Sequence, residues 1–125
     1  MVFGIGTDII EVKRMQRHLE KNDALRKKLY TEGEQAYCER ANVMKYQSYA
    51  ARFAAKEAFF KALGTGYRYG MAFHEIEVFN DELGKPFIKP HGKVKEYLEE
   101  NKVTHIHLTI SHVKKMASAF VVLEN

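Results

Sequence analysis

Residues 45–64 read KYQSYAARFAAKEAFFKALG, and this alanine-rich, proline-free stretch is the strongest helix signal in the chain. Gly64 stands where a left-handed helix cap favours glycine, so the helix is expected to end at Leu63. The remaining elements are expected to pack around this helix. At 100° per residue, four large apolar side chains fall within about 80° of arc and predict a core-facing stripe: Tyr49, Phe53, Phe60 and Leu63.

The segments around this helix predict further helices and strands. Helical spacing predicts helices over 11–21, through Leu25 and Leu29, and over 92–101, and a capping box at Thr31 and Glu34 predicts another. Alternating patterns predict a buried strand over 2–10 and two hairpins, formed by 74–79 with 86–89 and by 105–112 with 116–123. Together these elements predict one α+β domain over residues 1–125, with a mainly antiparallel sheet packed with helices.

Composition excludes several classes of protein. The chain has 125 residues, of which 46% are hydrophobic and 29% charged, which excludes a disordered tail or a collagen-like fibre. Apolar runs are too short for a transmembrane helix, and the first residues lack the cationic flank of a signal peptide, so no membrane association is expected. The single cysteine, Cys38, cannot form an intrachain disulfide, and a cytoplasmic location is the expectation.

Positive charge is concentrated near the N-terminus. The formal net charge is +4, and residues 10–29 alone hold seven Lys or Arg against three Asp or Glu, which is also +4. Such a surface suits an anionic partner (nucleic acid, a membrane surface or an acidic protein), although a solvated helix face is the simpler interpretation. The basic residues of the first predicted helix are Lys13, Arg14, Arg17 and Lys21.

Glu57 and Lys61 lie beside the apolar stripe of the long helix, about 40° apart, on the strip shared with Ala50 and Ala54. A glutamate and a lysine four residues apart most often form a helix-stabilising ion pair. The small neighbouring side chains, which let a backbone or a ligand come close, and the glycine loop one turn later support a functional alternative.

Asp8 follows an apolar run in which Gly4 and Gly6 would let a ligand approach the backbone closely. Capping of the following helix is the commoner role of such an aspartate. Two carboxylates from different elements and a nearby lysine are, however, the groups that a magnesium–phosphate site needs, because Mg²⁺ takes one or two carboxylates together with phosphate oxygens. Asp8, Glu57 and Lys61 are therefore candidate catalytic residues, with Asp8 and Glu57 as metal ligands.

Residues 62–66, ALGTG, span the end of the long helix and the start of a glycine-rich loop. The lysine precedes the glycines, which excludes a Walker motif, yet free backbone N–H groups in the loop could hold an anion. In the strand predicted at 105–112, His112 ends an apolar row, either as a histidine at the edge of the core or as a group aimed at a site.

Four motifs occur together in the order of a known family: GIGTDIIE at 4–11, RFAAKEAFFKALGTG at 52–66, GKP at 84–86 and TISH at 109–112. With them the chain resembles, nearly end to end, the holo-acyl-carrier-protein synthases, the short type of 4′-phosphopantetheinyl transferase. Residues 22–45 carry little of the resemblance. It implies transfer of the 4′-phosphopantetheine group of coenzyme A to a serine of apo-acyl carrier protein, with release of adenosine 3′,5′-bisphosphate, in support of fatty acid biosynthesis.

The resemblance also implies roles for individual residues. Asp8 and Glu57 would hold Mg²⁺ against the pyrophosphate of coenzyme A, and Lys61 would contact the phosphate. Either Lys61 or a metal-bound water would take the proton of the serine. Pro86 would border the adenine. The nucleotide and its phosphates would meet four further residues: Gly64, Thr65, Gly66 and His112.

Members of the family are typically homotrimers with active sites between subunits. Acyl carrier proteins are acidic, so the resemblance implies that the basic first helix binds the carrier protein.

Two other classes of function compete with this interpretation. A small nucleic-acid-binding module is suggested by the basic helix, but no RNA-recognition signature or zinc finger occurs, and nucleic acid is not an expected partner. In a non-catalytic assembly protein, Glu57 and Lys61 would only stabilise their helix.

Overall fold

The long helix forms as predicted in the computed structural model, which describes residues 1–125. Helix α4 runs from Lys45 to Leu63 and ends at Gly64, whose φ of 80° is the left-handed cap conformation. The predicted core-facing stripe of α4 was too narrow, because α4 packs against β1 and β5 on one side and against α1, α3 and β2 on its other sides. Its side chains are therefore buried around most of its circumference.

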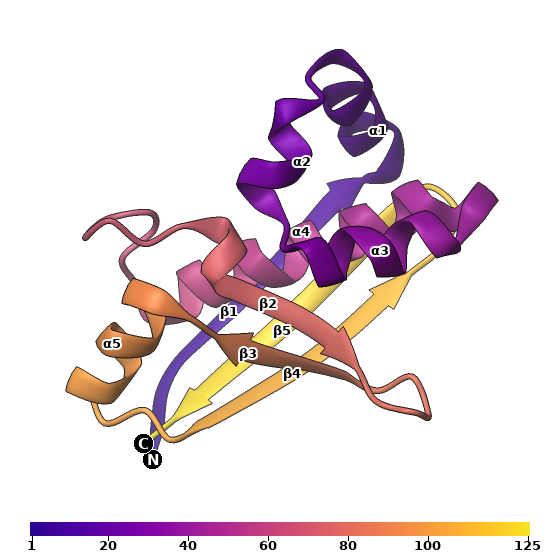
Figure 1. Ribbon diagram of the computed structural model, residues 1–125. Coiled ribbons are helices and arrows are strands. Elements are labelled where there is room, and N and C mark those ends of the chain that lie inside the picture. The colour runs from indigo at the N-terminus through magenta and orange to yellow at the C-terminus, as the bar shows by residue number, and fades with distance from the viewer.

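Two antiparallel sheets accompany α4 (Figure 1). The larger has the order β1 (Val2–Glu11), β5 (Met116–Glu124), β4 (His105–His112), and its β4–β5 hairpin matches the prediction. The smaller is the hairpin of β2 (Ile76–Asn80) and β3 (Pro86–Pro90), joined by a turn over 81–84. The prediction of an α+β fold with mainly antiparallel sheet and packed helices is confirmed.

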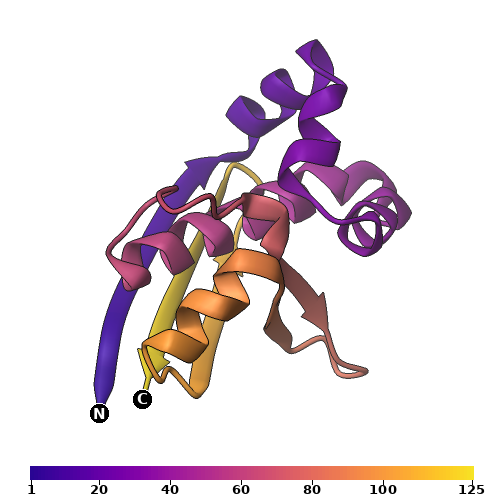
Figure 2. The same ribbon diagram turned by 60° about the vertical axis from the view of Figure 1, so that its left-hand side comes forward.

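Four shorter α-helices complete the fold: α1 (Val12–Lys21), α2 (Ala24–Leu29), α3 (Glu32–Arg40) and α5 (Gly92–Glu100). Short 3₁₀ helices occupy Asn42–Met44 and Phe73–Glu75. Figures 1 and 2 show the helices and the small hairpin gathered on one side of the larger sheet, with α1 and α2 beyond the end where β1 finishes. None of the helices combines the length and apolar character that crossing a bilayer requires.

Strand β1 approaches α4 very closely through its glycines. A Cβ at Gly4 would overlap the carbonyl oxygen of Ala62, and one at Gly6 would overlap that of Ala58. These glycines therefore admit a helix backbone, not a ligand as the sequence suggested. The opposite face of β1 is open, with Ile5 and Ile9 60% and 64% exposed, so the prediction of a buried strand holds for one face only.

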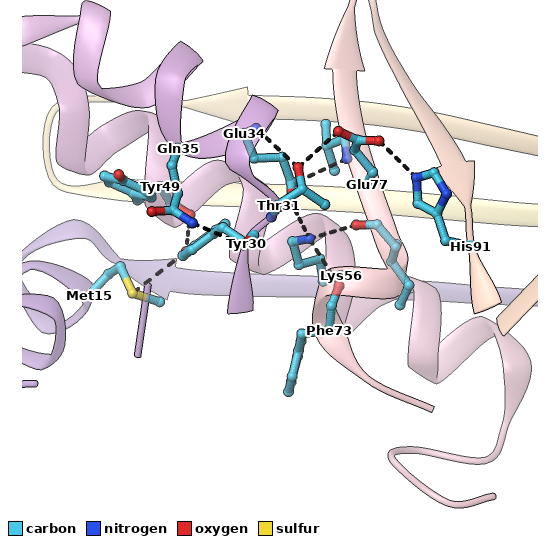
Figure 3. A network of polar contacts seen from close by, with 12 residues as sticks. Met15, Tyr30, Thr31, Glu34, Gln35, Tyr49, Lys56, Phe73, Glu77 and His91 are labelled. Carbon is cyan, nitrogen blue, oxygen red and sulfur yellow. Dashed lines mark hydrogen bonds and ion pairs between the residues drawn. The ribbon is translucent and has the colours of Figure 1, made fainter. Parts of the chain in front are cut away.

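A buried ion pair joins α4 to α3 and to the start of β2 (Figure 3). Lys56 Nζ lies 2.8 Å from Glu34 Oε1 and also donates to the carbonyl oxygens of Phe73 (3.0 Å) and Ile76 (2.6 Å). Glu34 Oε2 accepts the backbone N–H of Val78 at 2.9 Å. Both charged side chains are fully buried, and burial lowers the pKa of Lys56 although the neighbouring Glu34 carboxylate opposes this.

The predicted capping box connects this pair to the surface. The Thr31 hydroxyl accepts the Glu34 N–H at 3.1 Å, and the Glu34 carboxylate accepts the Thr31 N–H at 3.0 Å, which confirms the start of α3. The same hydroxyl donates to Glu77 at 2.9 Å, and Glu77 in turn pairs with His91 at 2.8 Å (Figure 3). Every charged side chain in this network, from Lys56 to His91, thus has a hydrogen-bonding partner.

Removing one member of the buried pair is expected to destabilise the protein strongly. Lys56→Met and Glu34→Gln should each lower the free energy of unfolding by about 3–5 kcal/mol, because each leaves a buried group without its partner. The double variant should lose less than the sum of the two, as measured by urea unfolding in a double-mutant cycle. Lys45→Met, which removes an exposed partner of Glu39, should cost at most about 1 kcal/mol. Additive losses, or equal losses for Lys56→Met and Lys45→Met, would contradict this.

Candidate active site

Asp8 lies on the face of β1 that is turned toward α4. Strand alternation puts Asp8 on the same side as Gly6 and the buried Ile10, and its side chain is 18% exposed. Its neighbour in α4 is Lys61, whose Nζ lies 3.2 Å from Asp8 Oδ1 and 3.0 Å from the carbonyl oxygen of Thr7. Asp8 makes no side-chain hydrogen bond to the start of α1, so it does not act as a helix cap.

Glu57 lies one turn before Lys61 on α4, but the two form no ion pair. Lys61 pairs across the fold with Asp8, whereas Glu57 Oε1 accepts a hydrogen bond from the hydroxyl of Tyr67 at 2.7 Å. The interpretation of Glu57 and Lys61 as a helix-stabilising pair is therefore wrong. Partial burial, the hydrogen bond to Glu57 and the nearby charges of Glu57 and Asp8 raise the pKa of Tyr67 to about 12, which keeps its hydroxyl a donor at neutral pH.

One cavity of about 400 Å³ brings both carboxylates together. Asp8, Glu57 and Tyr67 contribute polar groups, and α1 adds Arg14 and His18. The rest of the lining is largely apolar and comes from β1, α1, α2, α4 and the 3₁₀ helix before β2: Ile9, Ile10, Met15, Leu25, Leu29, Phe53 and Phe73. The cavity thus offers two anionic groups beside an apolar wall.

The carboxylates retain free acceptor atoms. Asp8 Oδ2 and Glu57 Oε2 make no hydrogen bond within the chain. Three or more His, Cys, Asp or Glu side chains gather nowhere in the structure, so a cation in this cavity would find at most the two carboxylates as acidic protein ligands. That donor set fits Mg²⁺, which takes one or two carboxylates and fills its other positions with water and phosphate oxygens.

The glycine loop continues from α4 beside Lys61. Gly64 uses its N–H in the helix cap, donating to the carbonyl oxygens of Phe60 and Lys61 at 3.1 Å each. The backbone N–H groups of Thr65 and Gly66 have no such partner and remain available to an anion. Within residues 62–66, only Thr65 and Gly66 therefore have backbone N–H groups without a partner, and the binding of an anion there stays a prediction.

Pro86 and His112 lie apart from the carboxylates in a single chain. They line a second cavity of about 300 Å³, which shares no residue with the first. Its buried cation is Arg52, whose Nη2 donates to Asn80 Oδ1 at 2.7 Å and whose guanidinium lies 4.1 Å from the centre of the Tyr37 ring. Arg52 Nε is buried without a partner.

The basic residues of α1 are all exposed, while Val12, Met15 and Leu19 face the core as predicted. Arg14 differs from the other three because it also lines the first cavity. Lys13, Arg17 and Lys21 lie on the solvent side of the same helix. Sequence reasoning missed two residues: Tyr67, one position after the glycine loop, and Arg52, an arginine within an otherwise apolar helical run.

Comparison with known proteins finds relatives that match almost the whole chain. Residues 4–121 match the family described as the 4′-phosphopantetheinyl transferase superfamily. The holo-[acyl-carrier-protein] synthase of Solibacter usitatus is 46% identical over the full length of both chains. The crystal structure of the holo-[acyl-carrier-protein] synthase from Neisseria meningitidis superposes with a TM-score of 0.92 at 37% identity, covering all of both chains.

A third relative was solved with a ligand. The structure of a holo-(acyl-carrier-protein) synthase from Bacillus anthracis in complex with CoA (3′,5′-ADP) has a TM-score of 0.81 at 38% identity, covering 98% of this chain and 96% of that one. Matches of this identity and coverage, in sequence and in structure, lead to one assignment. The chain belongs to the 4′-phosphopantetheinyl transferase superfamily, in its holo-[acyl-carrier-protein] synthase family.

Proposed function

We propose that the protein transfers the 4′-phosphopantetheine group from coenzyme A to a serine of apo-acyl carrier protein, and so supports fatty acid biosynthesis. The serine hydroxyl gives up its proton to water, its oxygen forms a bond to the phosphorus that carries the pantetheine, and the bond to the nucleotide phosphate breaks, releasing adenosine 3′,5′-bisphosphate. The observation that carries the proposal is that Asp8 of β1 and Glu57 of α4 line one cavity, with Lys61 of α4 paired to Asp8. The ligand of the Bacillus anthracis relative supports coenzyme A as the substrate.

Asp8 and Glu57 would hold Mg²⁺ through the oxygens that the chain leaves unpartnered. A bound Mg²⁺ offsets the negative charge of the pyrophosphate and of the transferring phosphoryl group. Without a cation, two carboxylates in one cavity repel the phosphates that must enter it. Lys61 reduces that repulsion, because its ammonium lies against Asp8.

Lys61 acts as a positioned cation. Its Nζ donates to Thr7 and to Asp8, which leaves the third N–H free for a phosphate oxygen. The N–H groups of Thr65 and Gly66, in the loop that begins at the end of α4, would supply further donors to an anion. Lys61 and these backbone donors would hold the phosphate beside the carboxylates that would bind Mg²⁺, and so orient it for attack by the serine.

The exposed basic face of α1 is proposed as the docking surface for the acidic carrier protein. It borders the cavity through Arg14 and His18, so a carrier protein seated there brings its serine close to Asp8 and Glu57. Attraction between oppositely charged surfaces also speeds association and orients the partners.

The assembly is proposed to be a homotrimer of single-domain chains, each spanning residues 1–125, in which Pro86 and His112 of one chain meet the carboxylates of the next. Two observations support this. Pro86 and His112 line a different cavity of one chain from the one that holds Asp8 and Glu57, and the open face of the larger sheet exposes Ile5, Ile9 and Phe120. Cytoplasmic function is proposed as well, since the only cysteine, Cys38, is free and buried, as is usual for proteins of a reducing compartment.

Mass spectrometry of apo-acyl carrier protein tests the proposed reaction. Incubation with the enzyme, coenzyme A and Mg²⁺ should add the mass of one phosphopantetheine group to the carrier protein. Removal of Mg²⁺ by a chelator should prevent the gain. Absence of the gain with folded enzyme and Mg²⁺ would reject the proposed function.

Asp8→Ala and Glu57→Ala should abolish most of the transfer with little change in stability. Metal-ion stabilisation is worth several kcal/mol, so each variant should be slower by at least about a hundredfold. The free energy of unfolding should stay within about 1 kcal/mol of wild type, because both side chains are partly exposed. Glu99→Ala, on the exposed face of α5, is the control and should keep full activity. A variant that melts far below wild type with unchanged turnover per folded molecule would assign its residue a structural role.

Light scattering at micromolar concentration should report about three chains per particle, in keeping with a closed symmetric ring. Ile5→Lys places a charge on the open sheet face and should shift the particle toward the monomer with loss of transfer. A wild-type monomer with full activity would contradict the shared site.

Charge reversal on α1 should raise the KM for the carrier protein and leave the KM for coenzyme A nearly unchanged. Arg17→Glu is the sharper variant, because Arg14→Glu also alters the cavity lining. The effect should fade with salt, since the screening length falls from about 8 Å at 0.15 M to about 3 Å at 1 M. Lys95→Glu makes the same charge change on α5 and serves as the control. Equal effects on both KM values, or none, would exclude α1 as the docking surface.

A further inference from the structure

Each carboxylate of the candidate site has one oxygen held by the chain and one free. Lys61 Nζ holds Asp8 Oδ1 at 3.2 Å, and the hydroxyl of Tyr67 holds Glu57 Oε1 at 2.7 Å. Asp8 Oδ2 and Glu57 Oε2 have no partner within the chain. The two carboxylates are thus restrained in the same manner, although the group that restrains Glu57 comes from the loop after α4.

The ring of Tyr67 is held by the core even though the residue is 56% exposed. Its centre lies 5.2 Å from that of Phe60 in an edge-to-face contact and 4.8 Å from that of Phe73. Phe73 is itself fixed through its carbonyl oxygen, which accepts a hydrogen bond from the buried Lys56. The hydroxyl of Tyr67 therefore reaches Glu57 from a braced position.

We infer that Tyr67 is a positioning residue for Glu57: its hydroxyl fixes one carboxylate oxygen, so that the other faces the cation and the phosphate at a constant orientation. The inference rests on the proposed function, in which Glu57 is a metal ligand. A glutamate side chain rotates about three bonds, and a group that restrains a ligating side chain commonly changes metal affinity by about ten- to a hundredfold. In this role Tyr67 contacts the metal-ligating side chain of Glu57 and not the reacting atoms.

Tyr67 could instead have a purely structural role, through the packing of its ring. The variant Tyr67→Phe distinguishes this role from the positioning of Glu57. Phenylalanine keeps the contacts with Phe60 and Phe73 and removes only the hydroxyl. Tyr69→Phe is the matched control, because Tyr69 belongs to the same loop but stacks on Tyr97, 5.8 Å away, and does not touch Glu57.

The experiment measures cation binding without turnover. Mn²⁺ is titrated by electron paramagnetic resonance into the full-length protein with coenzyme A present and the carrier protein absent. Tyr67→Phe should weaken Mn²⁺ binding by about tenfold or more, as expected for the partner of a ligating group, whereas Tyr69→Phe should match wild type. The Mg²⁺ concentration for half-maximal transfer should rise by the same factor, while kcat at saturating Mg²⁺ and the melting temperature change little.

Two results would overturn the inference. One is equal Mn²⁺ affinity in wild type and Tyr67→Phe, and the other is a loss of kcat or melting temperature without a change in cation affinity. Failure of the proposed function gives a different result, because the wild-type enzyme then leaves the carrier protein unmodified. Wild-type transfer combined with unchanged cation affinity in Tyr67→Phe would reject the positioning role alone.

Discussion

An ammonium and a carboxylate that share no contact with solvent, Lys56 and Glu34, join α3, α4 and the start of β2. Such a pair stabilises a fold only if every proton and lone pair finds a partner, because desolvation of two charges is costly. Here the backbone supplies those partners, and the carbonyl oxygen of Phe73 is one of them. Since Phe73 lines the cavity and contacts Tyr67, the geometry of the candidate site depends on a charge pair that no substrate touches.

Local signals predicted most of the fold. The bounds of α4, the capping box of α3, the apolar face of α1 and both hairpins follow from hydrogen bonds or spacings within a few residues, which sequence patterns report directly. Burial was predicted less well. The burial of β1 and of α4 depends on elements distant in the chain, which decide whether one or both faces of β1 are covered and how far around α4 the core extends. Likewise, Gly4 and Gly6 meet Ala62 and Ala58 only in the folded protein.

In the candidate site, too, local features were predicted and contacts between distant elements were not. Asp8, Glu57 and Lys61 were identified from residue type and spacing, and the structure brings all three together. Their partners could not be read from spacing, because the i,i+4 rule favours a pair between Glu57 and Lys61, whereas tertiary contacts give Lys61 to Asp8 and Glu57 to Tyr67. Sequence patterns did not identify Arg52 and Tyr67, because Arg52 bonds to Asn80 of another element and Tyr67 lies in a loop that turns back toward Glu57 of α4.

Neighbouring residues of α4 serve different cavities: Arg52 lines one, and Phe53 lines the other together with Glu57. A helix packed around most of its circumference moves as a rigid rod, so a substitution that shifts its axis alters both cavities at once. Mutations in α4 are therefore pleiotropic, and selection for a changed contact in one cavity is opposed by its effect in the other. The loops at 66–70 and 81–85 are free of that coupling, because each borders only one of these two cavities, and adaptation to a new substrate has its most accessible routes there.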